Sequence, residues 1–167
     1  MNEGLSERDA QTLLGWGPRT VSIVASTTEI QDPYQDVMFE KGDLVLGRGL
    51  DTLRQALGAA LATALGADPL NPTFGFEGLA IVADESDRFL LRERLRVAVV
   101  NVLRSDARID GIDQVLIGRA EIDAARAGES ASPAPKDFGL MEVEVRFRLR
   151  GRPERLALGI GSILGSG

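Results

Sequence analysis

The sequence predicts an α+β domain, with a mainly antiparallel sheet of about five strands and two helices packed on one face. Three observations lead to this fold class. Residues 141–150 alternate between apolar and charged side chains, as in a strand that buries one face and wets the other. Residues 50–65 and 87–104 instead repeat apolar residues at three- and four-residue steps, the period of a helix face. Clusters of Gly and Pro between these segments predict loops.

The first regular element is a hairpin of residues 36–39 and 44–46, with Gly42 available for a positive φ in its turn. A helix follows, with Asp51 or Thr52 as its cap. The apolar face of this helix is formed by Leu50, Leu53, Leu57, Leu61 and Leu65. Because few charges flank that face, we expect the helix to be covered on most sides.

Residues 68–78 contain two Pro, two Gly and two Phe, which predicts a rigid, partly buried loop. An amphipathic helix is expected at 87–104 and a strand at 112–117. Residues 118–137 are rich in Ala, Gly, Ser, Pro and charge, so we expect an exposed, mobile loop before the alternating strand at 141–150. The chain closes with a last strand at Leu156, Leu158 and Ile160 and a tail that frays through Gly159, Gly161 and the glycines after them.

Residues 1–34 are irregular and predict an N-terminal extension or docking arm ahead of one domain at 35–167. Within this arm, residues 21–24 are apolar and β-branched enough for a short strand. Trp16 lies between two glycines. Because an exposed indole is uncommon, we expect Trp16 to be a buried or interface anchor.

The absence of His and Cys excludes most catalytic and metal-binding chemistry. Neither a Ser-His-Asp nor a Cys-His nucleophile can form, and imidazole- or thiolate-ligated metals, iron–sulfur centres and disulfides are excluded as well. No phosphate-binding glycine loop and no calcium-loop spacing is present. We therefore expect no catalytic residue, no enzyme activity, no cofactor and no bound metal.

The chain of 167 residues has 19 Lys and Arg against 25 Asp and Glu, a net charge of −6. This acidic balance disfavours binding to nucleic-acid phosphates. Residues 56–67 are uncharged but far fewer than the roughly 20 apolar residues of a membrane span. The first ten residues resemble no signal peptide. We expect a protein made in the cytoplasm, with no nucleic-acid partner and no membrane insertion.

Two groups of residues are candidates for chemistry or contacts. Glu77 stands beside Phe74 and Phe76, so it is the acid most expected in an apolar setting, although a capping or salt-bridged carboxylate is the plainer interpretation. Asp106 and Arg108 are two residues apart between a helix and a strand, and could form one bidentate acid–guanidinium unit. The alternative for this pair is a surface ion pair of little energetic weight.

The order of several motifs resembles one protein family. A hairpin ending in Gly-Asp-Leu-Val-Leu (42–46) precedes a helix containing Leu-Arg-Gln-Ala-Leu (53–57). A Pro-x-Phe-Gly loop (72–75), a second helix and acid-x-Arg (106–108) follow before a strand pair. Over residues 35–150 this order resembles the lysozyme-like baseplate wedge family of contractile injection machines. That family includes phage W-type wedge proteins, the TssE component of type VI secretion and the corresponding subunit of extracellular injection particles.

The resemblance implies a structural subunit of a phage-tail-like baseplate. Its partners would be the larger wedge subunits, which form a core helical bundle, and the sheath protein; spike and hub proteins are further candidates. Asp106 and Arg108 stand where family members carry Glu-Pro-Arg, with a shorter acid and without the proline, which implies docking on the core bundle. The loop residues implied in packing or an interface are Pro72, Phe74 and Gly75.

The resemblance also implies that the sheath starts by strand pairing, which needs an unpaired sheet edge. We expect that edge at residues 141–150 and the tail after them, with contacts from Val143, Val145 and Phe147. Two other functions stay open: a lysozyme that cleaves peptidoglycan with a carboxylate pair, and a binding module unrelated to injection machines. The sequence also leaves open whether the machine is a phage tail, a type VI-like system or an extracellular particle.

Overall fold

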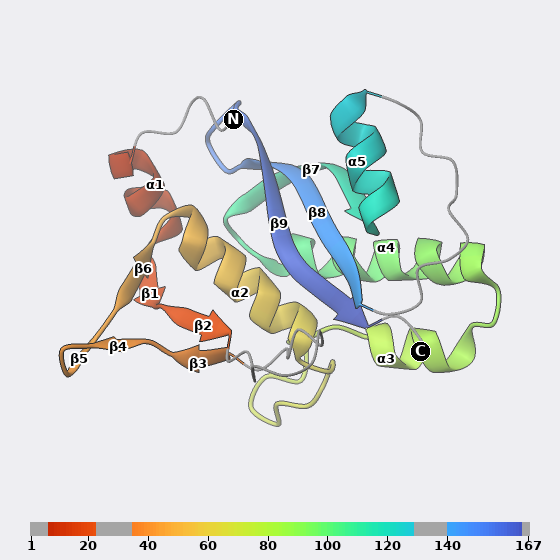
Figure 1. The fold of residues 1–167 in the computed structure, drawn as a ribbon, viewed down its shortest axis with the longest axis horizontal. Coiled ribbons are helices and arrows are strands. Elements are labelled where there is room, and N and C mark those ends of the chain that lie inside the picture. Colours follow the sequence, from red (N-terminus) through yellow and green to blue (C-terminus); the bar gives the residue numbers. More distant parts are fainter. Residues whose placement is uncertain (1–6, 23–34, 129–139, 165–167) are drawn as a thin grey trace. The chain divides into compact units, whose positions relative to one another are not determined.

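The computed structural model describes residues 7–22, 35–128 and 140–164 (Figure 1). The chain divides into two compact units, a smaller one at residues 3–56 and a larger one at 57–167. The boundary falls inside a helix, α2 (Leu50–Ala62). It does not fall at residue 34, where we had predicted the end of the N-terminal arm.

The smaller unit consists of one helix, the first turns of α2 and short strands paired two by two. Strand β1 (Trp16–Pro18) pairs with β6 (Leu46–Arg48), and β2 (Thr20–Ser22) pairs with β3 (Gln35–Val37). The remaining elements are α1 (Glu7–Leu14), β4 (Phe39–Glu40) and β5 (Asp43–Leu44). The predicted hairpin is confirmed as β4 and β5, whose turn places Lys41 and Gly42 at φ 53° and 84°.

The described part of the predicted arm belongs to this small unit, because β1 and β2 pair with strands that follow residue 34. Gln55 of α2 strengthens the arrangement: its Nε2 donates to the Pro18 carbonyl at 2.8 Å, and its Oε1 accepts from the Thr20 N–H at 3.0 Å. Trp16 is 68% exposed, so the expectation of a buried indole is wrong, while an interface role stays a prediction. Of the predicted strand at 21–24, residues 23 and 24 lie outside the described residues.

The two predicted helices are confirmed, and the structure adds a short third helix between them. Leu53, Leu57 and Leu61 of α2 are buried, whereas Leu65 lies beyond the helix end and is exposed. Helix α4 (Arg88–Ser105) begins after Asp87, whose side chain accepts hydrogen bonds from the first-turn N–H groups of Phe89 and Leu90. The unpredicted α3 (Gly78–Asp84) lies between them in the chain.

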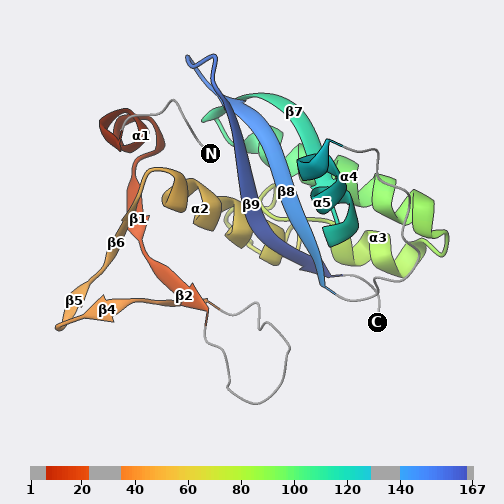
Figure 2. The same ribbon diagram turned by 45° about the horizontal axis from the view of Figure 1, so that its top comes forward.

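The larger unit is built on one three-stranded antiparallel sheet in the order β7-β8-β9. The strands are β7 (Ile109–Ile117), β8 (Leu140–Leu149) and β9 (Arg155–Leu164). Helix α4 runs alongside β7 in both views (Figures 1 and 2). The expected sheet of about five strands is therefore too large. The N-terminal strands form separate two-stranded pairs and do not join this sheet in the part of the chain that is described.

The core of the larger unit lies on one face of the sheet. This core contains side chains from β8 and from α4 that are at most 1% exposed. From β8 these are Val143, Val145, Phe147 and Leu149, and from α4 they are Leu95, Val99 and Leu103. The predicted alternation of β8 is confirmed by this buried set.

The region expected to be a mobile loop contains a helix, α5 (Arg119–Ala127). Gly118 precedes it, and Gly128 closes it in the left-handed conformation at φ 76°. The helix buries Ile122 and contacts β7 and β8. The loop expectation is therefore wrong at 119–127, and residues 129–137 lie outside the described residues. The expectation of a fraying tail is also wrong in part, because Gly159 and Gly161 lie within β9.

Candidate functional site

Asp106 and Arg108 form a bidentate ion pair in the turn between α4 and β7. The Arg108 Nε donates to Asp106 Oδ1 at 2.9 Å, and Nη2 donates to Oδ2 at 2.6 Å. The backbone N–H of Arg108 also donates to Oδ1, at 2.9 Å. Both side chains are partly buried, with 15% of Asp106 and 26% of Arg108 exposed. The predicted acid–guanidinium unit therefore exists, and it is more buried than a free surface pair.

Backbone hydrogen bonds hold this turn in place. The Asp106 N–H donates to the Leu103 carbonyl at the end of α4, and the Asp106 carbonyl accepts from Ile109 at the start of β7. The Arg108 carbonyl accepts from the Arg150 N–H at 2.9 Å, which ties the turn to the connection between β8 and β9. The ion pair thus lies on a rigid corner where a helix and two strand ends meet.

The electrostatics of the pair keep it ionised. Partial burial on its own raises the pKa of Asp106, but hydrogen bonds from the Arg108 side chain and backbone outweigh burial and hold that pKa below its ordinary value of 3.8. The hydrogen bond to Asp106 raises the pKa of Arg108 against the opposing effect of its burial. The site therefore presents a fixed charge pair throughout the neutral pH range.

The Pro-x-Phe-Gly loop packs back on the end of α2. The Phe76 N–H donates to the Thr63 carbonyl at 2.8 Å, and the Phe76 carbonyl accepts from the Leu65 N–H at 3.1 Å. Gly75 has φ 116°, and a Cβ there would lie 2.7 Å from the Thr63 oxygen, so only glycine fits. Phe76 is buried, Phe74 is half-buried and Pro72 is exposed. The rigid, partly buried loop is confirmed, and its contact with a partner stays a prediction.

The structure corrects the expected position of the sheet edge. Residues 140–149 form the central strand β8, which pairs with β7 on one side and β9 on the other. Val143, Val145 and Phe147 therefore pair within the chain and point into the core, and β8 has no unpaired side for a sheath strand. The second part of the expectation, the tail after β8, does reach an edge of the described sheet, because β9 is an outer strand.

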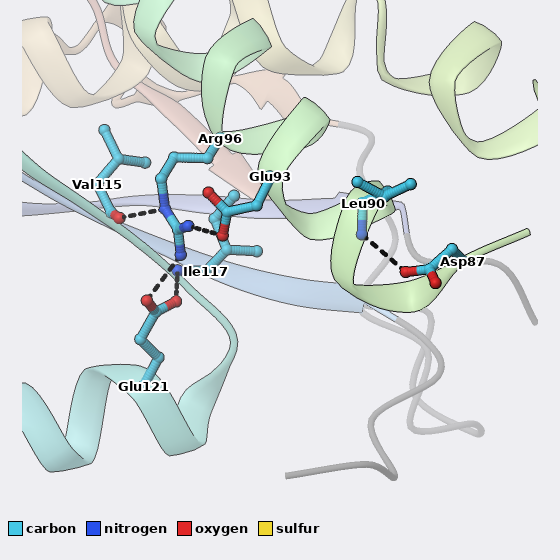
Figure 3. Close-up of polar contacts among 7 residues, drawn as sticks. All are labelled: Asp87, Leu90, Glu93, Arg96, Val115, Ile117 and Glu121. Atoms are coloured by element: carbon cyan, nitrogen blue, oxygen red, sulfur yellow. Dashed lines mark hydrogen bonds and ion pairs between the residues drawn. The ribbon is translucent and has the colours of Figure 1, made fainter. Parts of the chain in front are cut away.

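Side chains from α4 and α5 close the other edge of the sheet, at β7 (Figure 3). The Gly118 N–H donates to the Glu142 carbonyl of β8, so the neighbouring Ile117 directs its N–H to the opposite side. There the Ile117 N–H donates to Glu121 Oε2 at 2.8 Å, and the Val115 carbonyl accepts from Arg96 Nε at 3.1 Å. These two groups are the ones a further strand would have used.

Arg96 and Glu121 also bind each other, with 2.7 Å between Arg96 Nη2 and Glu121 Oε1. Glu93 of the same helix pairs with Arg96 as well. Burial lowers the pKa of Arg96, but these carboxylates outweigh burial and raise it above its ordinary value. We call Arg96 and Glu121 the β7 clamp. Its members come from α4 and α5, so it fixes both helices to the strand they flank.

A second polar cluster lies where α5 contacts β8. The Glu144 side chain is 7% exposed, and its Oε2 accepts from Arg126 Nη2 of α5 at 2.7 Å. Arg146 lies 3.5 Å from the other carboxylate oxygen. We had placed Glu144 on a wet face. It is buried because α5, which we did not predict, covers that part of the strand.

Glu77 does not lie in the apolar setting that the lysozyme alternative needs. It is exposed and precedes α3 without capping that helix through its side chain. Among the described residues, no group of three or more Asp and Glu is placed to hold a metal ion. No helix in that part of the chain is both long and apolar enough to cross a bilayer.

Comparison with models of known protein families gives no match for this chain. Comparison with curated proteins gives none either.

The clamp residues were missed for an identifiable reason. Arg96 lies on the polar face of an amphipathic helix, where most charged residues are solvated, and Glu121 lies in a segment we interpreted as a loop. A signal for α5 was present, because residues 119–127 are mostly helix-favouring. Gly118 before them marks the end of a strand, and Gly128 after them is a typical helix stop. With a helix predicted at 119–127, Glu121 would lie in its first turn and therefore close to the end of β7.

Proposed function

We propose that this protein is a structural, non-catalytic subunit of the baseplate wedge of a contractile injection machine. In this role it binds the core helical bundle of the larger wedge subunits and initiates sheath assembly by strand pairing. It would be assembled from the cytoplasm into the baseplate of a phage tail, a type VI-like system or an extracellular particle. The motif order over residues 35–150 is the sequence argument for this proposal.

The structural observation that carries the proposal is the Asp106–Arg108 pair. A charged group whose position is fixed before binding favours an interface, since each side chain ordered on association costs free energy. The bidentate geometry and the three backbone hydrogen bonds of the turn meet that requirement. Arginine is also among the residues most enriched at the centres of interfaces.

For sheath assembly by strand pairing, the strand order supports β9, and not β8, as the strand that a sheath strand would join. The clamp occupies the outer backbone groups of Val115 and Ile117 on β7, while no further strand pairs with β9 in the described sheet. An incoming strand therefore has one candidate edge. Its main chain would extend the sheet order from β7-β8-β9 to a fourth strand.

The test is a pull-down from the native host with a tag joined by a spacer to the C-terminal end of the chain, followed by mass spectrometry. The unaltered chain should recover sheath, tube and larger baseplate proteins. Arg108→Ala should keep the fold and lower the yield of the core-bundle subunits by about tenfold or more, equivalent to about 1.4 kcal/mol of binding free energy.

Arg54→Ala is the matched control, because Arg54 also pairs with an aspartate, Asp51, at 3.3 Å but is about half exposed on α2. This variant should recover the core-bundle subunits at the normal yield. If Arg108→Ala also does so, the role given to Arg108 is wrong. If the unaltered chain recovers none of these machine proteins and stays a folded monomer, the proposed function itself is wrong, and a binding module of another kind is the better interpretation.

A further inference from the structure

On the outer face of the three-stranded sheet, arginines outnumber the carboxylates that they contact. Arg146 and Arg148 of β8 and Arg155 of β9 gather around Asp113 of β7. Asp113 lies 3.6 Å from the Arg148 Nε and 3.4 Å from the Arg155 Nε, so one carboxylate serves two guanidinium groups. We call Arg146, Arg148 and Arg155 the arginine face.

A second carboxylate, Glu144, is also shared between two arginines. Glu144 lies 3.5 Å from Arg146 but binds Arg126 more closely, at 2.7 Å. Glu142 lies toward the other end of β8, opposite Ser162. Each of the three arginines therefore shares its carboxylate with another arginine: Arg148 and Arg155 share Asp113, and Arg146 shares Glu144 with Arg126.

The register makes this arrangement costly for the protein alone. Arg148 and Arg155 are direct cross-strand partners, and like charges directly opposite each other destabilise a sheet. Asp113 offsets that repulsion only in part, since its two contacts are long for ion pairs of this kind. A further anion bound between the two guanidinium groups would remove the repulsion.

The face is also shaped to accept a ligand. A shallow depression of about 370 Å3 is lined by Asp113, Gln114, Arg146, Arg155, Leu156 and Ala157. Ala157 lies directly opposite Arg146 and leaves the sheet surface low beside it. The Arg148 guanidinium crosses Gly111 of β7, where a Cβ would come within 2.5 Å of its Nη2. Arg148 is thus held across the sheet and does not extend freely into solvent.

We propose that the arginine face binds an acidic, extended segment of a protein partner. Residues two apart on a strand project from the same face about 7 Å apart, so Arg146 and Arg148 match carboxylates at alternate positions of an extended peptide. Guanidinium groups bind carboxylates in bidentate fashion, and binding would give Arg148 and Arg155 the second anion they lack. This surface is distinct from the Asp106–Arg108 corner and from the main-chain edge of β9, so the inference does not rest on the proposed function.

The test measures binding of a fluorescein-labelled peptide of alternating serine and glutamate, about ten residues long, by fluorescence anisotropy with the purified full chain. The expected result is saturable binding that weakens as salt is added, and no binding of the same peptide with glutamine in place of glutamate. Arg148→Gln combined with Arg155→Gln should weaken the binding by about tenfold or more.

The matched control is Arg54→Gln combined with Arg94→Gln, which removes the same charge from arginines paired with Asp51 and Glu85 elsewhere on the chain. This control should change the affinity by less than about twofold, since neither arginine belongs to the arginine face and exposed charges are screened by salt. A cooperative thermal unfolding transition in both double variants would confirm that each is folded. Removing the opposed arginines should not lower the stability of the sheet.

Three outcomes would overturn the inference. The first is no saturable binding of the glutamate peptide to the unaltered chain at low salt. The second is an equal loss of affinity in the two double variants, which would mean that the peptide responds to the net charge of the chain and not to the arginine face. The third is tighter binding of a short DNA duplex than of the peptide, with the same dependence on Arg148 and Arg155; this would assign the face to nucleic acid.

Discussion

The two edges of the central sheet are built in opposite ways. At β7, the outer backbone groups of Val115 and Ile117 are bound by the side chains of Arg96 and Glu121, which project from two different helices. At β9, no further strand is paired in the described part of the chain. One edge is therefore closed by the protein itself, and the other is available to a partner.

This difference shows how a protein can leave one sheet edge open to a further strand while its own side chains block the other. An unpaired edge is a template for any strand, including one from a second copy of the same chain. Side chains that hydrogen-bond to the backbone remove that template without adding a strand. The clamp does so at the end of β7 where α5 begins, and so restricts main-chain pairing to the β9 side.

The largest expected effect comes from opening the closed edge. Glu121→Ala removes the acceptor of the Ile117 N–H and one carboxylate of Arg96, leaving two partly buried donors without their partner. We expect a loss of about 1–3 kcal/mol in the free energy of unfolding, measured by urea denaturation. Light scattering should also show concentration-dependent self-association, because the β7 edge would accept another strand.

Two further variants separate the loss of the Ile117 hydrogen bond from the loss of a carboxylate beside Arg96. Glu121→Gln keeps an oxygen for the Ile117 N–H and should lose less stability than Glu121→Ala. Glu93→Ala removes a carboxylate from Arg96 but leaves both β7 contacts in place, so it should not promote self-association. If Glu121→Ala is as stable and monomeric as the unaltered chain, the clamp does not close the edge.

A change at the open edge should act in the opposite direction. Gly159 is an exposed strand residue, and a Cβ built on it meets no atom within 4 Å. Gly159→Val should therefore raise the free energy of unfolding by about 0.5–1 kcal/mol, since valine favours strand geometry and restricts the unfolded chain. Gly58→Val is the contrasting variant, because a Cβ at Gly58 lies 3.2 Å from the Ile160 carbonyl and should destabilise the fold. A stability loss at Gly159 would mean that its outer face is covered.

The smallest expected effect concerns the start of β7, where the Asp106–Arg108 pair fixes the turn. The pKa of Asp106 is depressed in the folded state, so its contribution to stability is complete above the ordinary value of 3.8 and is lost as pH falls through the lower folded pKa. Asp106→Asn should therefore reduce the acid sensitivity of unfolding below about pH 4. Denaturation curves between about pH 2 and 7 test this, with Asp51→Asn, from the exposed pair on α2, as the control. Equal pH dependence of Asp106→Asn and the unaltered chain would contradict it.

Much of the fold follows from local patterns in the sequence. The leucine steps of α2, the amphipathic repeat of α4 with Asp87 before it, the turn at Gly42 and the alternation of β8 depend on neighbours in the chain. For that reason each was predicted near its true place. The Asp106–Arg108 pair is equally local, since two residues that are two apart in an extended turn can meet whatever the rest of the molecule does.

The remaining features depend on which segments meet in space. Alternation predicts that β8 has a buried face, but the order β7-β8-β9 decides that it is central and that β9 is the edge. Helix α5 decides that Glu144 is buried and that Glu121 reaches Ile117. The facing arginines of β8 and β9 come together only through the strand register. By itself, the sequence determined α2, α4, the hairpin turn at Gly42 and the buried face of β8, because side-chain periodicity is a local property. Edges, clamps and charge clusters join residues about 20 to 40 positions apart, so the tertiary structure alone decided them.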